Sequence, residues 1–232
     1  MLARSMKYSC SPIELTSFNI HINNVWLHGK TCVKYLGVLI DSRLDWSSHV
    51  QLIKRKLLYA CNMFFKIRKF VPIDILRLLY FCFFHCHLQY CVISWGTANN
   101  SVLQPLSVLI NNILWIMTFS KYRCHITPLC KNLKILKLND IYQFEFEKFM
   151  HKFHHGKLPE LHKEYFKETS SVHSYRTRFA NMENYFIHRV SSNAGKKSIS
   201  YRGASLWNKA EQNLKAVPLS TFCNQLQEFG FS

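Results

Sequence analysis

Residues 75–95 form a nearly continuous apolar run, which restricts the fold more than any other feature of the sequence. The run is about long enough for a helix to cross a bilayer. It contains Arg77, His85, His87 and Gln89, however, and polar groups inside a membrane span are costly. A helix in the middle of a soluble bundle is also apolar on every side. We therefore expect a fully buried helix over residues 73–95 and no membrane partner, with a membrane span as the alternative.

Two amphipathic helices flank this run. Ser47 or Ser48 can cap a helix that continues to about residue 70, and Pro72 then ends it. A further helix is expected over residues 102–119, with Pro105 in its first turn, where a missing N–H is tolerated. Both helices have apolar residues at spacings of three and four, which place them on one side. These are Val50, Ile53, Leu57, Ala60, Phe64 and Ile67 in the first, and Leu106, Leu109, Ile110, Ile113, Ile116 and Met117 in the other.

Three short runs of β-forming residues precede the helices, at residues 18–22, 25–27 and 32–40. The pairs Asn23-Asn24 and His28-Gly29 between them are suitable turn residues. Two or three short strands are marginally stable alone. We therefore expect a small antiparallel β element that leans on the helices.

The rest of the chain is of mixed character. Short helices are expected over residues 127–138 and, capped by Asn139-Asp140, to about residue 154, where residues 155–159 stop the helix. Residues 169–203 have little periodicity and predict loop with one short strand pair, followed by helices over residues 205–214 and 219–229. The sequence thus predicts a mainly α fold in three regions: β strands in residues 1–45, a three-helix bundle in residues 46–120, and a helical and loop region, partly irregular and basic, in residues 121–232.

The charge of the chain points to a polyanionic partner. It has 30 Lys and Arg against 13 Asp and Glu, a formal net charge of +17 over 232 residues. Nucleic acid is the commonest partner for such an excess, and an anionic membrane surface is the rival. A hydrophobic content of 48% excludes a disordered chain. Residues 1–17 hold no apolar core of signal-peptide length, and the nine cysteines lack the spacing of a disulfide scaffold. We expect an intracellular protein, nuclear or cytoplasmic, with reduced thiols.

Five short blocks are distinctive. They are residues 33–41 with Leu44, Trp46 and His49; Leu88, Tyr90, Cys91, Trp95 and Gly96; residues 136–142 with Leu158 and Pro159; His173, Tyr175, Thr177 and Arg178; and Gly203, Trp207, Asn208 and Phe222. In this order, and over about residues 18–229, they resemble the C-terminal, post-palm part of LINE-type, jockey-like non-LTR retrotransposon reverse transcriptases.

The resemblance implies a thumb-like bundle in residues 46–120 and remnant strands of the palm edge in residues 1–45. The family polymerises DNA on an RNA template with three metal-binding aspartates, two of them adjacent, because two Mg²⁺ ions must be held side by side. This chain has four aspartates, none adjacent: Asp41, Asp45, Asp74 and Asp140. The catalytic palm and its Mg²⁺ are therefore expected outside this chain. We assign no catalytic residue and no cofactor, and expect no enzyme activity.

The expected function is sequence-tolerant RNA or DNA binding by a non-catalytic fragment of an RNA-directed DNA polymerase, with the palm and fingers as a further partner. The chain departs from the family in having Lys209-Ala210-Glu211 after Trp207-Asn208, where a Leu-Pro pair is usual, and Asn111-Asn112 where basic residues are usual. Two alternatives stay open. One is a helical protein-interaction module whose apolar face once met the palm, and the other is a decayed remnant without function.

The first candidate binding surface is the basic side of the first helix. Arg55, Lys66 and Lys69 align there with Tyr59 beside them, and residues 46–120 contain seven basic residues against one acidic residue, Asp74. A resembling thumb helix lays this side along the primer–template backbone, where phosphate contacts position the strand without reading its sequence. A plainly solvated face is the alternative.

The second candidate surface lies within residues 173–203. Its aromatic residues, among them Tyr175, Tyr185, Phe186 and Tyr201, alternate with basic ones, a pattern that suits single-stranded RNA. A tail packed on the helices by its aromatics is the alternative. The candidate cations are Arg176, Arg178, Arg189, Lys196, Lys197 and Arg202.

Two clusters invite a metal interpretation, which we do not adopt. Cys82, Cys86 and Cys91 lie with His85 and His87 in one apolar helix, where only two ligands one turn apart can converge. Core packing explains them better. A second group, His151, His154 and His155, lies at a helix C-terminus, where polar and cationic groups are favourable. We predict no metal site.

Overall fold

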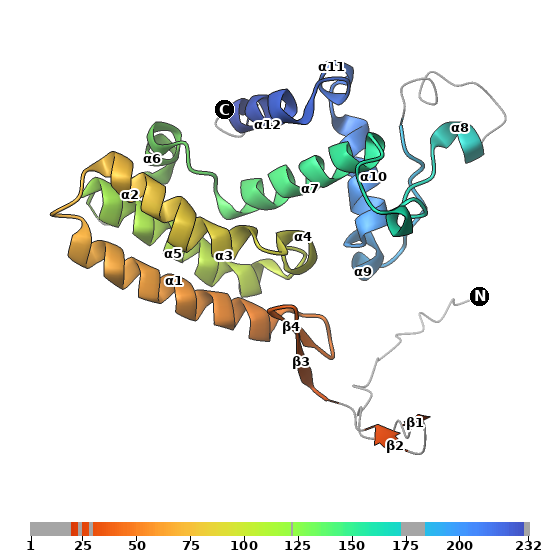
Figure 1. Cartoon of the computed structure of the whole chain (residues 1–232), viewed down its shortest axis with the longest axis horizontal. Coiled ribbons are helices and arrows are strands. Elements are labelled where there is room, and N and C mark those ends of the chain that lie inside the picture. The colour runs from red at the N-terminus through yellow and green to blue at the C-terminus, as the bar shows by residue number, and fades with distance from the viewer. Residues whose placement is uncertain (1–19, 23–24, 28–29, 122, 173–183, 230–232) are drawn as a thin grey trace, which may run out of the picture.

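The computed structural model describes residues 20–22, 25–27, 30–121, 123–172 and 184–229 (Figure 1). It confirms a mainly helical fold with a small antiparallel β element on its N-terminal side. Helices α1 (Ser47–Ile67) and α5 (Asn100–Thr118) pack along each other, and the segment from α2 to α3 packs on both. Helix α7 (Leu138–His154) joins this layer to the C-terminal helices.

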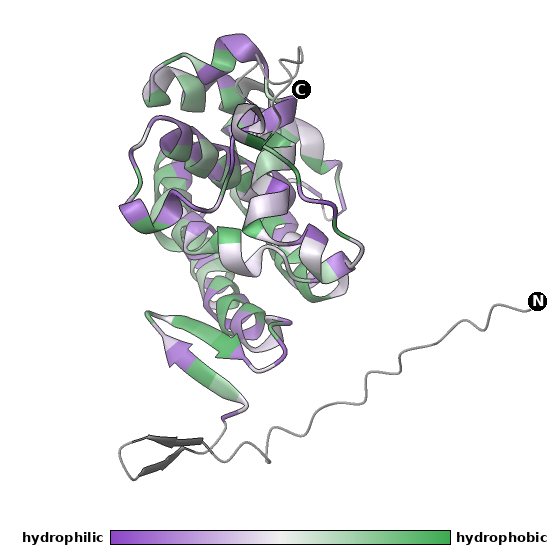
Figure 2. Ribbon diagram, turned by 90° about the vertical axis from the view of Figure 1, so that its right-hand side faces the viewer, coloured by the Kyte–Doolittle hydropathy of each residue, from purple (hydrophilic) through white to green (hydrophobic). Residues whose placement is uncertain are grey.

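The strands form two separate hairpins. β1 (Ile20–Ile22) pairs with β2 (Val25–Leu27), and β3 (Cys32–Tyr35) pairs with β4 (Val38–Asp41), both antiparallel. The prediction of a single strand over residues 32–40 was wrong. Leu36 and Gly37 both adopt positive φ, 46° and 84°, so the run folds back on itself. Figure 2 shows this hairpin at the end of the helical bundle, next to the start of α1, which β4 contacts.

Helix α1 begins where expected but with a different cap. Trp46, in the left-handed region, is the N-cap residue, and no side chain caps this end in the usual way. The carboxylate of Asp41 instead accepts hydrogen bonds from the backbone N–H of Asp45 and Trp46, each at 2.9 Å. Asp45 accepts one from Ser47 N–H at 2.9 Å, which lowers the pKa of its carboxyl. The prediction of a serine cap was therefore wrong, because Asp41 and Asp45 accept the hydrogen bonds of the N–H groups around this turn.

The prediction of one fully buried helix over residues 73–95 was also wrong. The segment consists of α2 (Ile73–Tyr80), the π-helical turn η2 (Phe81–His85), α3 (Cys86–Gln89) and α4 (Val92–Trp95). It breaks at Cys91, whose φ is 52°. One side is buried, and the other is exposed, with Leu78 59% and Phe83 54% accessible. The reason is that α1, α5 and α7 cover only the inner side.

Helix α5 confirms the helix expected over residues 102–119, although it starts two residues earlier. Pro105 therefore lies inside the helix and not in its first turn. Within the described residues, α5 is the one helix long and apolar enough to cross a membrane. It packs along α1, and its Leu106, Ile113 and Leu114 are completely buried, which is also the environment of a core helix.

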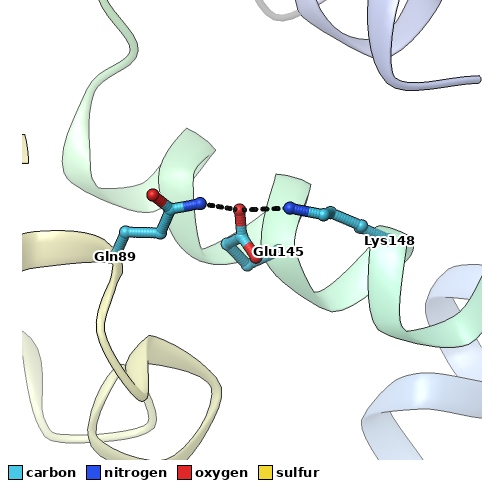
Figure 3. Close-up of polar contacts among 3 residues, drawn as sticks. All are labelled: Gln89, Glu145 and Lys148. Carbon is cyan, nitrogen blue, oxygen red and sulfur yellow. Dashed lines mark hydrogen bonds and ion pairs between the residues drawn. The ribbon is translucent and has the colours of Figure 1, made fainter. Parts of the chain in front are cut away.

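Helix α7 is tied to the inner layer by a polar contact. Gln89 of α3 donates from Nε2 to Glu145 Oε1 at 2.6 Å, and Lys148 Nζ lies 3.4 Å from the same oxygen (Figure 3). This helix and the stop after it confirm the prediction, except that Lys137 and not Asn139-Asp140 is the N-cap residue. The preceding α6 (Ile126–Leu133) ends earlier than residue 138 because Lys134 takes positive φ, 51°.

The C-terminal region is more helical than predicted. Instead of one helix over residues 205–214, α10 (Ile199–Lys209) and α11 (Gln212–Lys215) are separate. The hydroxyl of Ser198 caps α10 by accepting from Tyr201 N–H, which explains the early start. The isolated bridge between Glu168 and Tyr185 stands in place of the expected strand pair. The other elements are η3 (Glu160–His162), α8 (Thr169–Val172), α9 (Asn193–Lys196) and α12 (Leu219–Phe229), the last with the predicted bounds.

One hydrophobic core extends through the helices from α1 to α12. Its largest fully buried side chains include Trp95, Phe146, Trp207 and Phe222. The core therefore joins residues that the sequence divides at residue 120, and the boundaries at residues 45 and 120 stay predictions.

Candidate nucleic-acid interface

The outward side of α1 carries the first set of predicted binding residues. Arg55, Tyr59 and Lys66 are all exposed, Tyr59 to 69%. Positions 55 and 66 differ by three helical turns plus about 20°, so their side chains leave the same side of the helix. Lys69 is exposed just beyond the end of α1. The structure thus brings Arg55, Tyr59 and Lys66 to one surface, as predicted from their spacing.

A groove of about 770 Å³ lies next to these residues, between α1 and the segment η2–α3. Arg55 and Lys56 supply cations to it, and Tyr59 and Phe83 supply exposed aromatic rings. The remaining lining residues are Leu52, Ala60, Met63 and His87. We call this surface, with Lys66 and Lys69, the α1 face.

The α1 face is electropositive. Helix α1 has three consecutive cations, Lys54, Arg55 and Lys56, all exposed, and it contains no acidic residue. Burial lowers the pKa of His87 in the groove, and the nearby Lys56 ammonium lowers it further. His87 is therefore largely neutral at pH 7, so the positive charge of the face comes from lysine and arginine.

Some residues of this face were not predicted from the sequence. Lys54 and Lys56 were left out, although their position beside Arg55 was a usable signal. Phe83 and His87 were placed inside a buried helix, and nothing in a uniformly apolar run indicates which side stays uncovered. Phe65 and Phe70 are also exposed, Phe70 to 85%. Of the two aromatic rings in the groove, Tyr59 was predicted from helical spacing, whereas Phe83 was found only in the folded molecule.

The structure does not bring all of the described cations of the second predicted surface together. Arg176 and Arg178 lie outside the described residues. Arg189 and Lys196 are exposed, in a loop and on α9. Lys197 Nζ donates to Asn99 Oδ1 at 2.8 Å, and the guanidinium of Arg202 lies 4.9 Å from the centre of the Tyr142 ring. Lys197 and Arg202 both line a second cleft.

Several residues of the five distinctive blocks contact one another. Tyr90 donates its hydroxyl proton to Leu36 O at 2.5 Å, and Trp95 donates from Nε1 to Tyr90 O at 2.8 Å. A Cβ on Gly96 would lie 2.3 Å from the Tyr142 ring, so the third block packs on the second. The motif residues at these contacts hold the β3–β4 hairpin, α4 and α7 together.

The last block has a similar structural role. A Cβ on Gly203 would lie 2.6 Å from Phe166, so only glycine permits this approach of α10. Asn208 accepts from Tyr185 N–H at 2.9 Å and donates to Tyr185 O at 2.8 Å. Trp207 is buried between α7 and α12.

The cysteine and histidine clusters have local partners. Cys86 donates its thiol proton to Cys82 O at 2.8 Å. His151 Nε2 lies 2.9 Å from Val217 O, and His155 Nε2 lies 3.1 Å from Lys215 O, so both rings attach α7 to the chain before α12. Within the described ranges, no group of three or more His, Cys, Asp or Glu side chains is placed to hold a metal ion. The eight described cysteines are all free thiols.

The chain matches no protein-family model, and neither the curated proteins nor the solved structures include a significant match to it.

Proposed function

We propose that this protein binds RNA or DNA through phosphate contacts made by the α1 face, without reading base sequence. The observation that carries the proposal is the coincidence of exposed cations and exposed aromatic rings on an acid-free helix. Arg55 and Lys66 are 11 residues apart, roughly 16 Å along the helix axis. That distance is about five times the 3.4 Å axial rise of a stacked strand, so the two side chains can contact phosphates several nucleotides apart.

The aromatic residues extend this argument to single strands. Tyr59 and Phe83 expose their rings beside Arg55 and Lys56. Bases stack on such rings whatever their sequence, while the cations follow the backbone. Duplex binding needs only the cations, so Tyr59 and Phe83 favour a single-stranded or partly unpaired ligand.

We further propose that the chain is a non-catalytic, C-terminal part of a LINE-type reverse transcriptase, located inside the cell. The five blocks support this because several of their residues contact one another around the hairpin, α4 and α7. The exposed Val33, Tyr35 and Leu36 of the β3–β4 hairpin suit a surface that a palm would cover. Asp41 and Asp45 accept hydrogen bonds from backbone N–H groups, so both carboxylates have a structural role at the start of α1.

Fluorescence anisotropy with labelled oligonucleotides tests the binding. We expect unrelated sequences of equal length to bind within about threefold of each other. Affinity should fall linearly on logarithmic axes as salt rises, because bound phosphates release counterions. Strong preference for one sequence, or no binding at low salt, would contradict the proposal. A primer-extension assay with Mg²⁺ and nucleotides is expected to show no product above the control without protein.

A second candidate function is protein interaction, and the exposed apolar residues favour it. Phe65, Phe70 and Leu78 are apolar side chains exposed on the surface, and exposed apolar side chains that gather in a patch mark protein contacts. The partner in this case is an apolar helix or the palm itself. Binding of such a partner would change little with salt, which separates it from phosphate binding. The third alternative, a remnant without function, predicts binding neither to nucleic acid nor to a protein partner.

A further inference from the structure

A second cleft, of about 410 Å³, lies where the turn after α4, the start of α5, the start of α7 and helix α10 meet. Two cations line it, Lys197 from before α10 and Arg202 from within it. Four amide side chains line it as well: Asn99, Asn100, Asn139 and Gln143. Among the described residues that line this cleft there is no carboxylate. We call it the amide cleft.

The two cations keep their charge for a ligand. Lys197 bonds the neutral oxygen of Asn99, which leaves two of its three N–H donors. Arg202 lies over the Tyr142 ring, and a guanidinium in that position keeps its in-plane donors. Within the described part of the chain, neither forms an ion pair. Both side chains therefore have neutral partners, and no carboxylate of the described residues is paired with either.

The start of α5 adds to the positive potential. Helix α5 has 19 residues, no side-chain hydrogen bond at its N-cap Asn99, and no acidic residue in its first turn. The first N–H groups of such a helix favour an anion. Asn100, the first residue of α5, lines the cleft. The cations, the amides and this helix end thus converge on one space.

The neighbouring cleft shows the opposite character. It shares Gln143 and Leu206 with the amide cleft but contains Asp140, Glu147 and Glu211 with Lys209. Gln143 donates to Glu147 at 2.8 Å, and burial raises the pKa of Glu147. The carboxyl groups of Asp140, Glu147 and Glu211 therefore line the neighbouring cleft and not the amide cleft.

We propose that the amide cleft binds one phosphate group of a nucleic-acid strand, at a position separate from the α1 face. A volume of a few hundred Å³ accepts a phosphate together with its nucleoside. Lysine and arginine would bond the phosphate oxygens, and the asparagine amides would bond the remaining oxygens or the sugar. Because the cleft is concave, a terminal 5′-phosphate fits it better than an internal one. This inference rests on the proposed nucleic-acid binding.

The test compares two versions of one short oligonucleotide, with and without a 5′-phosphate, at fixed salt. The phosphate is expected to tighten binding by about tenfold, as one charge-assisted interaction provides. Lys197→Gln with Arg202→Gln should abolish this difference. Lys209→Gln removes one positive charge from α10, the helix of Arg202, but in the neighbouring cleft, and should retain the difference. Lys197→Gln alone leaves Arg202 on Tyr142 and should lose part of the difference while circular dichroism stays unchanged.

Inorganic phosphate separates the failure of this inference from failure of the proposed function. Titration of the ¹⁵N-labelled protein should shift the side-chain amide signals of Asn99, Asn100 and Asn139. These shifts support the cleft even where no oligonucleotide binds the α1 face. The inference is overturned by a 5′-phosphate without effect together with unmoved amide signals. It is equally overturned by a tenfold difference that survives in the Lys197 and Arg202 double variant.

Discussion

The inner and outer sides of the α2–η2–α3 segment have similar apolar residues but opposite solvent exposure. On the inner side, Leu76, Phe84 and Leu88 are completely or almost completely buried against α1 and α5. On the outer side, Leu78 and Phe83 are more than half exposed. Hydrophobicity alone does not distinguish Phe83 from Phe84. The difference comes from neighbours, since the helices of this fold cover one side only.

This contrast identifies the outer side as a surface for contact. An apolar side chain on the surface is ordinary by itself, but a group of them beside a row of cations is not. The inner side therefore stabilises the fold, and the outer side, together with Arg55, Lys56 and Lys66, provides the proposed binding surface. Each side can be perturbed without the other.

The largest expected effect is on the inner side. Phe84→Ala should lower the free energy of unfolding by about 3–5 kcal/mol, because it leaves a cavity in a packed core. Its neighbour Phe83→Ala should change it by less than about 0.5 kcal/mol, because that ring is exposed. Urea denaturation of both variants measures this. Equal losses in the two variants would contradict the assignment of sides.

Hydrogen exchange compares the core with the hairpins. The amides of β1 to β4 should exchange at least about a hundredfold faster than those of residues 76–88, after correction for intrinsic rates. The reason is that the two-stranded hairpins have unpaired edges and only Val38 of β3 and β4 is buried. Equal protection of the strands and of residues 76–88 would show that the hairpins are as stable as the bundle.

A smaller effect is expected from pH. Burial lowers the pKa of His49, and Lys56 lowers it further, while its Nδ1 accepts from Leu39 N–H at 3.3 Å. The unfolded state then binds a proton at higher pH than the folded state, so stability is complete above about pH 6.5 and declines as pH falls below it. Burial lowers the pKa of His151 in the same direction.

Urea denaturation between pH 7.5 and 5.5 measures this decline. His49→Asn should reduce the pH dependence, whereas His125→Asn, which changes an exposed histidine, should retain it. A pH dependence that is the same in both variants would exclude a contribution of His49.

The sequence predicted the elements with clear periodicity and failed where tertiary contacts decide. Helix α1, helix α5 and the bounds of α12 follow from apolar spacing and from Pro72. The break at Cys91 was missed because the apolar run contains no Gly or Pro before Gly96. The hairpin turn at Leu36-Gly37 was missed because β-forming residues continue on both sides of it. At Cys91 the backbone turns without a local glycine or proline, whereas Gly37 was a usable turn signal that the β-forming residues around it outweighed.

The candidate sites show the same limit. The alignment of Arg55, Tyr59 and Lys66 could be predicted, because helical spacing fixes it. The amide cleft could not be predicted, because the contacts of Lys197 with Asn99 and of Arg202 with Tyr142 join residues far apart in the sequence. Charge in a sequence indicates a polyanionic partner, but only the fold shows which cations share a surface.

The most direct measurement of the central claim is the salt dependence of oligonucleotide affinity in two triple variants. The first replaces Arg55, Lys66 and Lys69 with Gln, and the control replaces the exposed Lys121, Lys131 and Lys134 with Gln. Both variants lose three charges and should keep the wild-type helix content. We expect the slope of log affinity against log salt to become shallower by about two or more in the first variant and by less than about one in the control. Equal slopes in the two variants would contradict binding by the α1 face.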